Sequence, residues 1–252
     1  MKGTVFQGNL QFHVEIEGES WTPGQTLRGK LNVHNQGTGS VGLGQVGITL
    51  AHASYKKVKA SDPKAFNAYH TQTFEAGQEL APGQTSELAW SIPLEETAPI
   101  TDKAGSLFLV FGNLSEKTKG GHLLITVGPG FIIQEYLKIF ENFFRFKAKE
   151  LRQFKDMVQI KMTAPSSKEF SSTEGLLLFI KTQASKLELK YEFTIKKLGY
   201  TKGSVELEKN ELVFPYSLSY KDFMLGKDMI DQDKMLVHFN EVLNQVKMKA
   251  NY

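Results

Sequence analysis

Apolar and polar residues alternate with a period of two through most of the first half of the chain. The clearest case is Phe12, Val14 and Ile16, which alternate with His13, Glu15 and Glu17. The same pattern recurs at residues 27–33, 46–50, 69–73 and 88–92, and an apolar run follows at 106–111. Side chains of a strand point alternately to the two faces of a sheet, so this pattern predicts half-buried antiparallel strands.

Turn residues separate these strands. The tetrapeptide Pro-Gly-Gln-Thr occurs at 23–26 and again at 82–85, each time just before a predicted strand. Proline at the second position of a turn and glycine at the third favour a type II turn. Closely spaced strands with such turns between them predict an immunoglobulin-like β-sandwich.

The apolar spacing changes from two to three or four residues in two stretches of the second half. A strongly aromatic stripe predicts a helix near 132–146, and a second stripe predicts a C-terminal helix near 231–249. Strands are predicted between them at 157–162, 176–182, 187–196 and 206–214. We interpret both stripes as faces that pack on a core. The alternatives are contact with a membrane surface or a partner for the aromatic stripe, and a homodimer contact for the terminal helix.

A polar, charged and glycine-ended segment at 113–121 predicts the domain boundary. We therefore expect an N-terminal sandwich over 1–118 and a C-terminal sandwich over 119–252, the latter opening with a short strand at 123–127. The predicted fold class is all-β, with two tandem antiparallel β-sandwich domains, a short helix in the second domain and a C-terminal helix.

Composition narrows the function classes. The chain has 252 residues, 40% of them hydrophobic and 23% charged, which is ordinary for a folded domain. A net charge of +3 does not predict nucleic-acid binding. The absence of cysteine excludes disulfides, zinc–thiolate sites and cysteine catalysis. No apolar stretch has the length of a signal peptide or a membrane span, so we predict a cytoplasmic location.

Three short motifs are compatible with chemistry, but their contexts argue against it. Glycines at 37, 39 and 42 match G-x-G-x-x-G, yet they run into a predicted strand and not into a phosphate-binding helix. Two S-x-x-K matches, at 54–57 and 61–64, lack the other elements of serine–lysine hydrolases. His13, Glu15 and Glu17 share a strand face that we interpret as solvated. We predict no catalytic residue, no cofactor and no metal.

Five residues form the candidate partner-binding site. Tyr55, Lys56, Lys57, Lys59 and Lys64 cluster in one predicted loop. Such a loop could bind a phosphate or an acidic peptide, and an ordinary solvated loop is the alternative.

Two longer elements resemble a known family. Residues 21–31, WTPGQTLRGKL, resemble the arrestin-type element in which a Pro-Gly turn precedes a strand that contains a glycine. Residues 80–101 resemble the later arrestin-type element, with a Pro-Gly turn, a strand ending in proline, and Pro-x-Thr. Within the arrestin-like clan the chain is most similar to the bacterial sporulation-control family. The resemblance covers residues 10–111 well and 120–200 loosely.

The resemblance implies two sandwiches, no cofactor and a scaffold or regulatory role. The predicted helix near 132–146 is richer in aromatic residues than the family pattern, and the C-terminal tail carries no motif that matches the family. We therefore do not assign the family's partners to this chain. The resulting hypothesis is a non-enzymatic adaptor or scaffold that binds a protein partner. The alternative is a carbohydrate- or small-ligand-binding sandwich with exposed aromatics such as Trp21 or Tyr55 in a shallow site. An enzyme of unfamiliar design is the third hypothesis.

Overall fold

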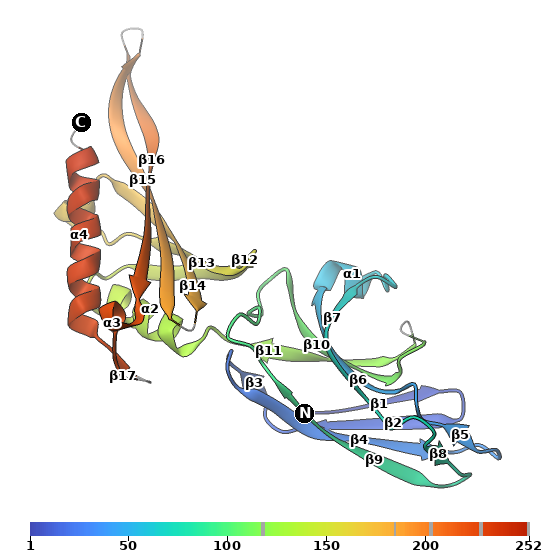
Figure 1. Cartoon of the computed structure of the whole chain (residues 1–252). Coiled ribbons are helices and arrows are strands. Elements are labelled where there is room, and N and C mark those ends of the chain that lie inside the picture. The colour runs from blue at the N-terminus through green and yellow to red at the C-terminus, as the bar shows by residue number, and fades with distance from the viewer. Residues whose placement is uncertain (117–118, 184, 202–203, 227–228, 251–252) are drawn as a thin grey trace. The chain divides into compact units, whose positions relative to one another are not determined.

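The computed structural model describes residues 1–116, 119–183, 185–201, 204–226 and 229–250. The chain divides into two units, Met1–Gly128 and Pro129–Tyr252 (Figure 1). Most of the described residues lie in antiparallel strands, which confirms the predicted all-β fold class.

The first unit is a sandwich of two sheets. The four-stranded sheet has the order β1-β2-β4-β9, formed by β1 (Lys2–Gln7), β2 (Leu10–Ile16), β4 (Thr26–Asn35) and β9 (Thr85–Pro93). The five-stranded sheet has the order β3-β11-β10-β6-β7, formed by β3 (Ser20–Trp21), β11 (Gly121–Val127), β10 (Gly105–Asn113), β6 (Val46–Ser54) and β7 (Phe66–Thr73). A short helix, α1 (Tyr55–Lys59), joins β6 to β7, and β5 (Val41–Gly42) pairs with β8 (Glu79–Leu80).

The core of this unit lies between the two sheets, as the alternation predicts. Phe12 and Val14 of β2 and Leu31 of β4 are fully buried on the inward side of the first sheet. Ile48 of β6 and Leu109 of β10 face them from the second sheet. Since alternate residues point the other way, β6 turns Gly47, Thr49 and Ala51 outward, and all three are small.

The two Pro-Gly-Gln-Thr turns adopt the same geometry. Gly24 and Gly83 have φ of 86° and 72°, the left-handed conformation that a type II turn requires at its third position. In each turn the glutamine amide N–H donates to a carbonyl three residues earlier, and the glutamine side-chain oxygen accepts from that earlier residue's N–H. Because the turns open β4 and β9, which pair antiparallel, they lie at opposite ends of one ladder.

The second unit contains a five-stranded sheet of order β12-β13-β14-β15-β16. Its strands are β12 (Lys147–Phe154), β13 (Met157–Thr163), β14 (Thr173–Gln183), β15 (Lys186–Thr201) and β16 (Ser204–Ser219). Its other elements are α2 (Phe131–Asn142), the 3-10 turn η1 (Lys168–Phe170), α3 (Tyr220–Phe223), the hairpin β17 (Met224–Gly226) with β18 (Met229–Ile230), and α4 (Gln232–Ala250).

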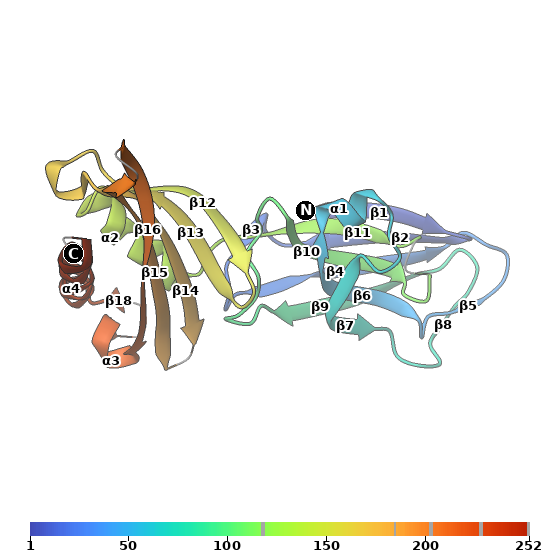
Figure 2. The same ribbon diagram turned by 90° about the horizontal axis from the view of Figure 1, so that it is seen from above.

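One layer of the second unit differs from the expected sandwich. In the described part of the unit, the sheet is covered by α2 and α4 where a second large sheet was predicted, and both helices lie on the same face in both views (Figures 1 and 2). Phe239 of α4 contacts Phe140 of α2, with ring centroids 4.3 Å apart, and lies beside Tyr191 of β15 at 5.6 Å. These two apolar stripes bury the inward face of the sheet, and no apolar face is left there for a second sheet to cover.

The aromatic helix ends earlier than predicted. The expected range was 132–146, but α2 ends at Asn142 because Arg145 takes a left-handed φ of 58° and reverses the chain. Phe146 then turns back, and its amide N–H donates to the carbonyl of Phe140 at 3.1 Å. Phe146 stays buried in the same aromatic cluster, so the apolar periodicity continued past the end of the helix. The C-terminal helix, expected at 231–249, is α4.

The predicted domain boundary at residue 118 is wrong. Residues 123–127, expected to open the second domain as a strand, belong to β11, which pairs with β10 and β3 in the first unit. Ile125 and Val127 of this strand are buried in the first core. The division therefore follows Gly128.

Candidate functional site

The five predicted site residues lie together on one short segment, but most of them are helical and not in a loop. Tyr55, Lys56, Lys57 and Lys59 belong to α1, which packs against the ends of β6 and β10. The amide N–H of Tyr55 donates to the carbonyl of Ala104 at 3.0 Å, which fixes the start of the helix on the sheet. Their role in binding a partner stays a prediction.

The turn after α1 places Lys64 beside the same segment. The amide N–H of Asp62 donates to the carbonyl of Lys57, and the Asp62 carboxylate accepts from the amide N–H of Lys64 at 2.8 Å. Ser61 takes a left-handed φ of 52° in this turn. The four lysine side chains are exposed, and none of the ion pairs among the described residues involves them.

An aromatic cluster lies directly under this segment. Phe108 of β10 makes edge contacts with Tyr55 and Phe66, at centroid distances of 6.2 and 5.7 Å. His122 of β11 completes the cluster, 5.6 Å from Phe66 and 5.9 Å from Phe108. Edge-to-face contacts of this kind hold the rings in fixed orientations. The lysine-bearing segment therefore packs on a cluster of aromatic rings.

Beside this cluster, the outward face of the five-stranded sheet is hollowed. The hollow has a volume of about 310 Å³, near the lower end of the roughly 300–1,000 Å³ usual for ligand sites. Its lining consists of Gln45, Thr49, Ala51, Pro63, Phe66, Ala68, Thr71, Thr73, Val110, Phe111, Asn113, Leu114 and Gly120. We call this space the β7 groove.

Small side chains on neighbouring strands create the β7 groove. The register places Thr49 opposite Thr71 and Ala51 opposite Ala68, so that two rows of small residues form the floor. The two threonine hydroxyls hydrogen-bond to each other at 3.0 Å. Their hydrogen-bonding capacity is thus largely used within the floor.

Larger residues close the two ends of the groove. Pro63 and Phe66 stand at the end near α1. At the other end Leu114 is held by its amide N–H, which donates to the carbonyl of Gln45 at 2.8 Å. The groove is therefore an apolar trough with a few polar groups along its margin, and it runs from the lysine-bearing segment along β6 and β7.

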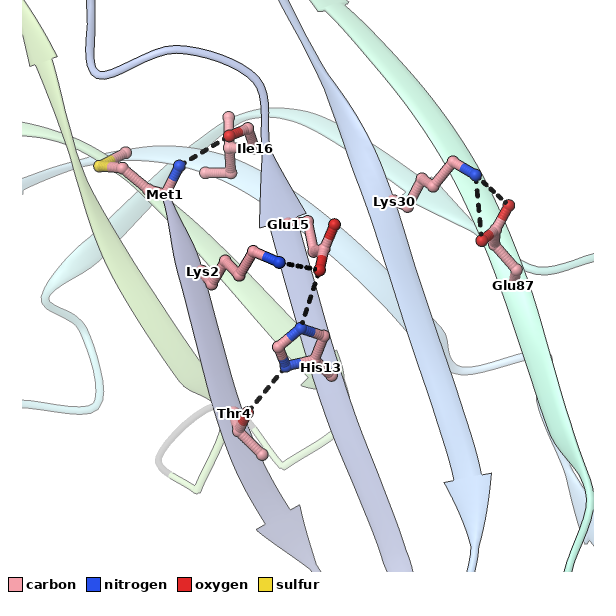
Figure 3. A network of polar contacts seen from close by, with 8 residues as sticks. All are labelled: Met1, Lys2, Thr4, His13, Glu15, Ile16, Lys30 and Glu87. Carbon is pink, nitrogen blue, oxygen red and sulfur yellow. Dashed lines mark hydrogen bonds and ion pairs between the residues drawn. The ribbon is translucent and has the colours of Figure 1, made fainter.

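The outward face of the four-stranded sheet has the opposite character. Lys2 contacts Glu15 at 2.6 Å, and the same Glu15 oxygen is 3.2 Å from Nε2 of His13, whose Nδ1 contacts Thr4 (Figure 3). The hydrogen bond from Lys2, followed by that from His13, lowers the pKa of the Glu15 carboxyl. The face on which His13, Glu15 and Glu17 were singled out is thus occupied by contacts between its own side chains.

The described residues offer no metal site by geometry. No group of three or more histidine, cysteine, aspartate or glutamate side chains gathers closely enough among them to hold an ion. The glycines at 37, 39 and 42 lead into the strands β5 and β6, as the sequence predicts. No helix in the described part of the chain is long and apolar enough to cross a membrane.

The second unit has a larger hollow, of about 480 Å³, on its sheet. Its lining is rich in charged side chains that already contact each other. Lys209 is 2.8 Å from Glu174, and the Arg152 guanidinium donates to the side-chain oxygen of Gln159. An incoming ligand would have to replace these contacts, which makes this hollow the weaker candidate.

The second unit also contains a buried polar network. Tyr136 of α2 and Tyr191 of β15 are fully buried and hydrogen-bond through their hydroxyls, and Nε2 of His238 on α4 lies 3.2 Å from the Tyr191 hydroxyl. Burial raises the pKa of both tyrosines and lowers the pKa of His238, against an opposing effect of Glu241. The network joins both helices to the sheet, so we interpret it as structural.

Sequence reasoning found the lysine-bearing segment and missed the groove beside it. Thr49, Ala51 and Ala68 carry no motif, and their meaning depends on which residues face each other across β6 and β7. The one available signal was that Gly47 and Thr49, at the outward positions of the strand predicted at 46–50, are both small. Trp21, considered as a sugar-stacking residue, is buried in the core.

Comparison with known proteins identifies the fold. No protein-family model matches the chain, and no curated protein matches it. Among solved structures, the chain is similar to Spo0M, a sporulation control protein from Bacillus subtilis, with a TM-score of 0.66 and 15% sequence identity. The match covers 95% of this chain and 99% of that chain. The resemblance inferred from the Pro-Gly turns is therefore confirmed at the level of the fold: the chain has the arrestin-like β fold of Spo0M.

Proposed function

We propose that the chain is a non-enzymatic regulatory adaptor that acts in the cytoplasm and binds a protein partner through the β7 groove. The observation that carries this proposal is an apolar trough on the outward face of the five-stranded sheet, next to four exposed lysines. Contiguous apolar surface of this kind on a rigid scaffold is typical of an interaction site. The arrestin-like fold, shared with a sporulation control protein, supports a regulatory role.

The chemistry of the groove supports binding over catalysis. Among the residues that the structure describes, its lining contains threonine, asparagine and glutamine but no carboxylate, histidine or lysine. A general acid or base needs a titratable group within hydrogen-bonding reach of the substrate. The same lining suits the burial of an apolar side chain with a few hydrogen bonds at the margin.

Site-specific photo-crosslinking tests the proposal. Ala68 in the groove is replaced by the photoreactive residue p-benzoylphenylalanine, and the full chain is irradiated in native lysate of its own organism. The matched control carries the same residue at Ala89, an exposed position of β9 on the outward face of the other sheet. We expect a discrete protein adduct from position 68 that position 89 does not give.

The captured partner is then purified and titrated into the unmodified chain by calorimetry. We expect binding that saturates at a fixed stoichiometry. Identical adducts from both positions, or no adduct at position 68, would contradict binding through the β7 groove. Conversion of a small molecule by the purified chain, lost on filling the groove, would contradict the non-enzymatic role.

A further inference from the structure

The size of the β7 groove limits what part of a partner enters it. A volume of about 310 Å³ accommodates one or two large side chains and not a folded element. Its floor is formed by alanine and threonine, and its ends are closed by Phe66 and Leu114. A large aliphatic or aromatic side chain would bury most of its surface there, which is the usual anchor of a peptide in a groove.

The surroundings of the groove set the charge of the partner. Lys56, Lys57, Lys59 and Lys64 lie within one turn of helix and the turn that follows it, next to the groove-lining residue Pro63. The one carboxylate within this segment, that of Asp62, accepts a backbone hydrogen bond in the same turn. At the other margin Glu116 is paired with Lys119 at 3.2 Å. The four lysines outnumber the one carboxylate of this segment, so the end of the groove near α1 has a net positive charge.

Aromatic contacts also hold the segment that carries these lysines against the sheet. Tyr55 and Phe66, at the two ends of the segment, both contact Phe108 of the sheet. The segment's position relative to the groove is therefore set by the packing of three rings. Ammonium groups arranged in this way favour carboxylates at a short distance along an extended peptide.

We propose that the β7 groove binds an extended, acid-rich segment of the protein partner, which places one large apolar side chain in the groove and its carboxylates beside Lys56, Lys57, Lys59 and Lys64. This inference rests on the proposed function. It adds the chemistry by which a partner is recognised: an apolar anchor flanked by aspartate or glutamate.

Selection from displayed random peptides of about ten residues tests this recognition. The full chain is the target, and counter-selection uses the Ala68→Trp variant, whose indole would fill the groove. We expect the surviving peptides to share one large apolar residue with several acidic neighbours. The absence of any peptide that distinguishes the wild type from Ala68→Trp, or a surviving set without acidic enrichment, would overturn the inference.

Synthetic peptides from the selection then separate the two contributions in fluorescence anisotropy titrations. Replacing the acidic residues of the peptide by their amides, or its apolar anchor by serine, should each weaken binding about tenfold or more. On the protein, Lys56→Glu/Lys57→Glu should weaken binding by a similar factor and reduce its salt dependence. Unchanged affinity in either series would remove that contribution from the proposal.

Matched variants exclude general effects of charge and of added bulk. Lys147→Glu/Lys149→Glu makes the same change in net charge at exposed positions of the second unit, and Ala89→Trp adds the same indole to the other sheet. Neither should alter affinity by more than about twofold, and all variants should keep the wild-type circular dichroism and melting temperature. Displacement of the peptide by a labelled oligonucleotide at equal concentration would identify a polyanion site and overturn the peptide assignment.

The peptide selection and the crosslinking experiment together distinguish failure of this inference from failure of the proposed function. If position 68 captures a partner but the selected peptides have no acidic character, the proposed function stands and this inference fails. If position 68 captures nothing, the proposed function fails first.

Discussion

On the outward face of the four-stranded sheet, long polar side chains contact one another across the strands, whereas small side chains on the outward face of the five-stranded sheet leave the β7 groove. Lys2 reaches Glu15, and Lys30 reaches Glu87 at 3.0 Å. On the other sheet Thr49 and Ala51 are too short to cover their neighbours on β7. Both sheets have the same alternation and pack on the same core. The outward side chains therefore decide which sheet surface is filled by its own contacts and which has a groove that can bind a ligand.

The largest effect is expected from substitutions that test whether the two sheets also differ in backbone spacing. A Cβ added to Gly29 of β4 would lie 2.0 Å from the carbonyl oxygen of Glu15, and one added to Gly47 of β6 would lie 2.2 Å from that of Gln72. Each contact is with backbone, so Gly29→Ala and Gly47→Ala should each destabilise the first unit by about 3 kcal/mol. Urea denaturation of the full chain measures the loss.

Gly39→Ala is the control, because nothing lies within 4 Å of its added Cβ. If Gly29→Ala and Gly47→Ala lower the free energy of unfolding equally, the two sheet faces differ only in their side chains. A loss in one sheet alone would mean that the two backbones also differ in how closely their strands approach.

The second prediction compares one ring on each face. Phe66 lies against Phe108 and His122 at the end of the groove, and Phe66→Ala should cost about 2 kcal/mol through lost burial and ring contacts. His13 on the other face contacts only polar groups, Thr4 and Glu15, near the surface, and His13→Ala should cost about 0.5 kcal/mol or less. Thermal unfolding of the full chain gives both values, and similar costs would break the comparison.

The third prediction separates the sheets by pH. Burial lowers the pKa of His52 of β6 below its ordinary 6.5, against an opposing effect of Asp102. The unfolded chain therefore binds this proton more readily, and the stability contributed by neutral His52 is complete above pH 6.5 and is lost as the pH falls through the lowered pKa. Glu15 of β2 has its pKa lowered below 4.5 by Lys2 and then His13, so its contribution is complete above pH 4.5 and is lost in more acid solution.

Denaturation midpoints recorded from about pH 7.5 to pH 3 should resolve the two windows. His52→Gln should flatten the upper window and Glu15→Gln the lower one. His238→Gln is needed beside them, because burial lowers the pKa of His238 in the second unit in the same direction. A His52→Gln profile that matches the wild type between pH 7.5 and 5 would contradict the assignment.

The smallest effect is expected from the polar face itself. Lys2 and Glu15 are 68% and 40% exposed, and exposed pairs contribute little because water competes for both charges. A double-mutant cycle with Lys2→Met and Glu15→Gln should give a coupling energy below about 1 kcal/mol, which about 0.5 M salt should largely remove. A coupling near 2 kcal/mol would mean that this surface contributes substantially to stability.

Local patterns predicted most of the longer strands, the helices α2 and α4 and both Pro-Gly turns, because each depends on residues close in sequence. Two of the longer strands, β1 and β12, were missed, and the two- and three-residue strands β3, β5, β8, β17 and β18 were not predicted either. In β1, Phe6 is 61% exposed and Gly3 takes an inward position, so the strand at the edge of its sheet shows no clear alternation. In β12 a bulge between Ala148 and Glu150 shifts the register and breaks the period of two.

The remaining errors share a non-local cause. The polar segment after Asn113 has the composition of a linker, yet the chain beyond it returns to pair with β10, and only that pairing assigns residues 121–127 to the first unit. The helical cover of the second sheet depends on where α2 and α4 pack. The groove likewise depends on the register of β6 with β7, whereas the lysines beside it are consecutive enough to be noticed in the sequence.

The paired Pro-Gly-Gln-Thr turns have a consequence for how the first unit opens. At one end of the β4–β9 ladder, Leu94 donates to the carbonyl of Gln25 and accepts from Gly24; at the other end, Asn35 donates to the carbonyl of Gln84 and accepts from Gly83. Both ends of this strand pair are held by backbone hydrogen bonds, so the amide hydrogens bonded between β4 and β9 should be among the slowest in the unit to exchange with solvent. Other loops of the unit can then differ in length without shifting the register between β4 and β9.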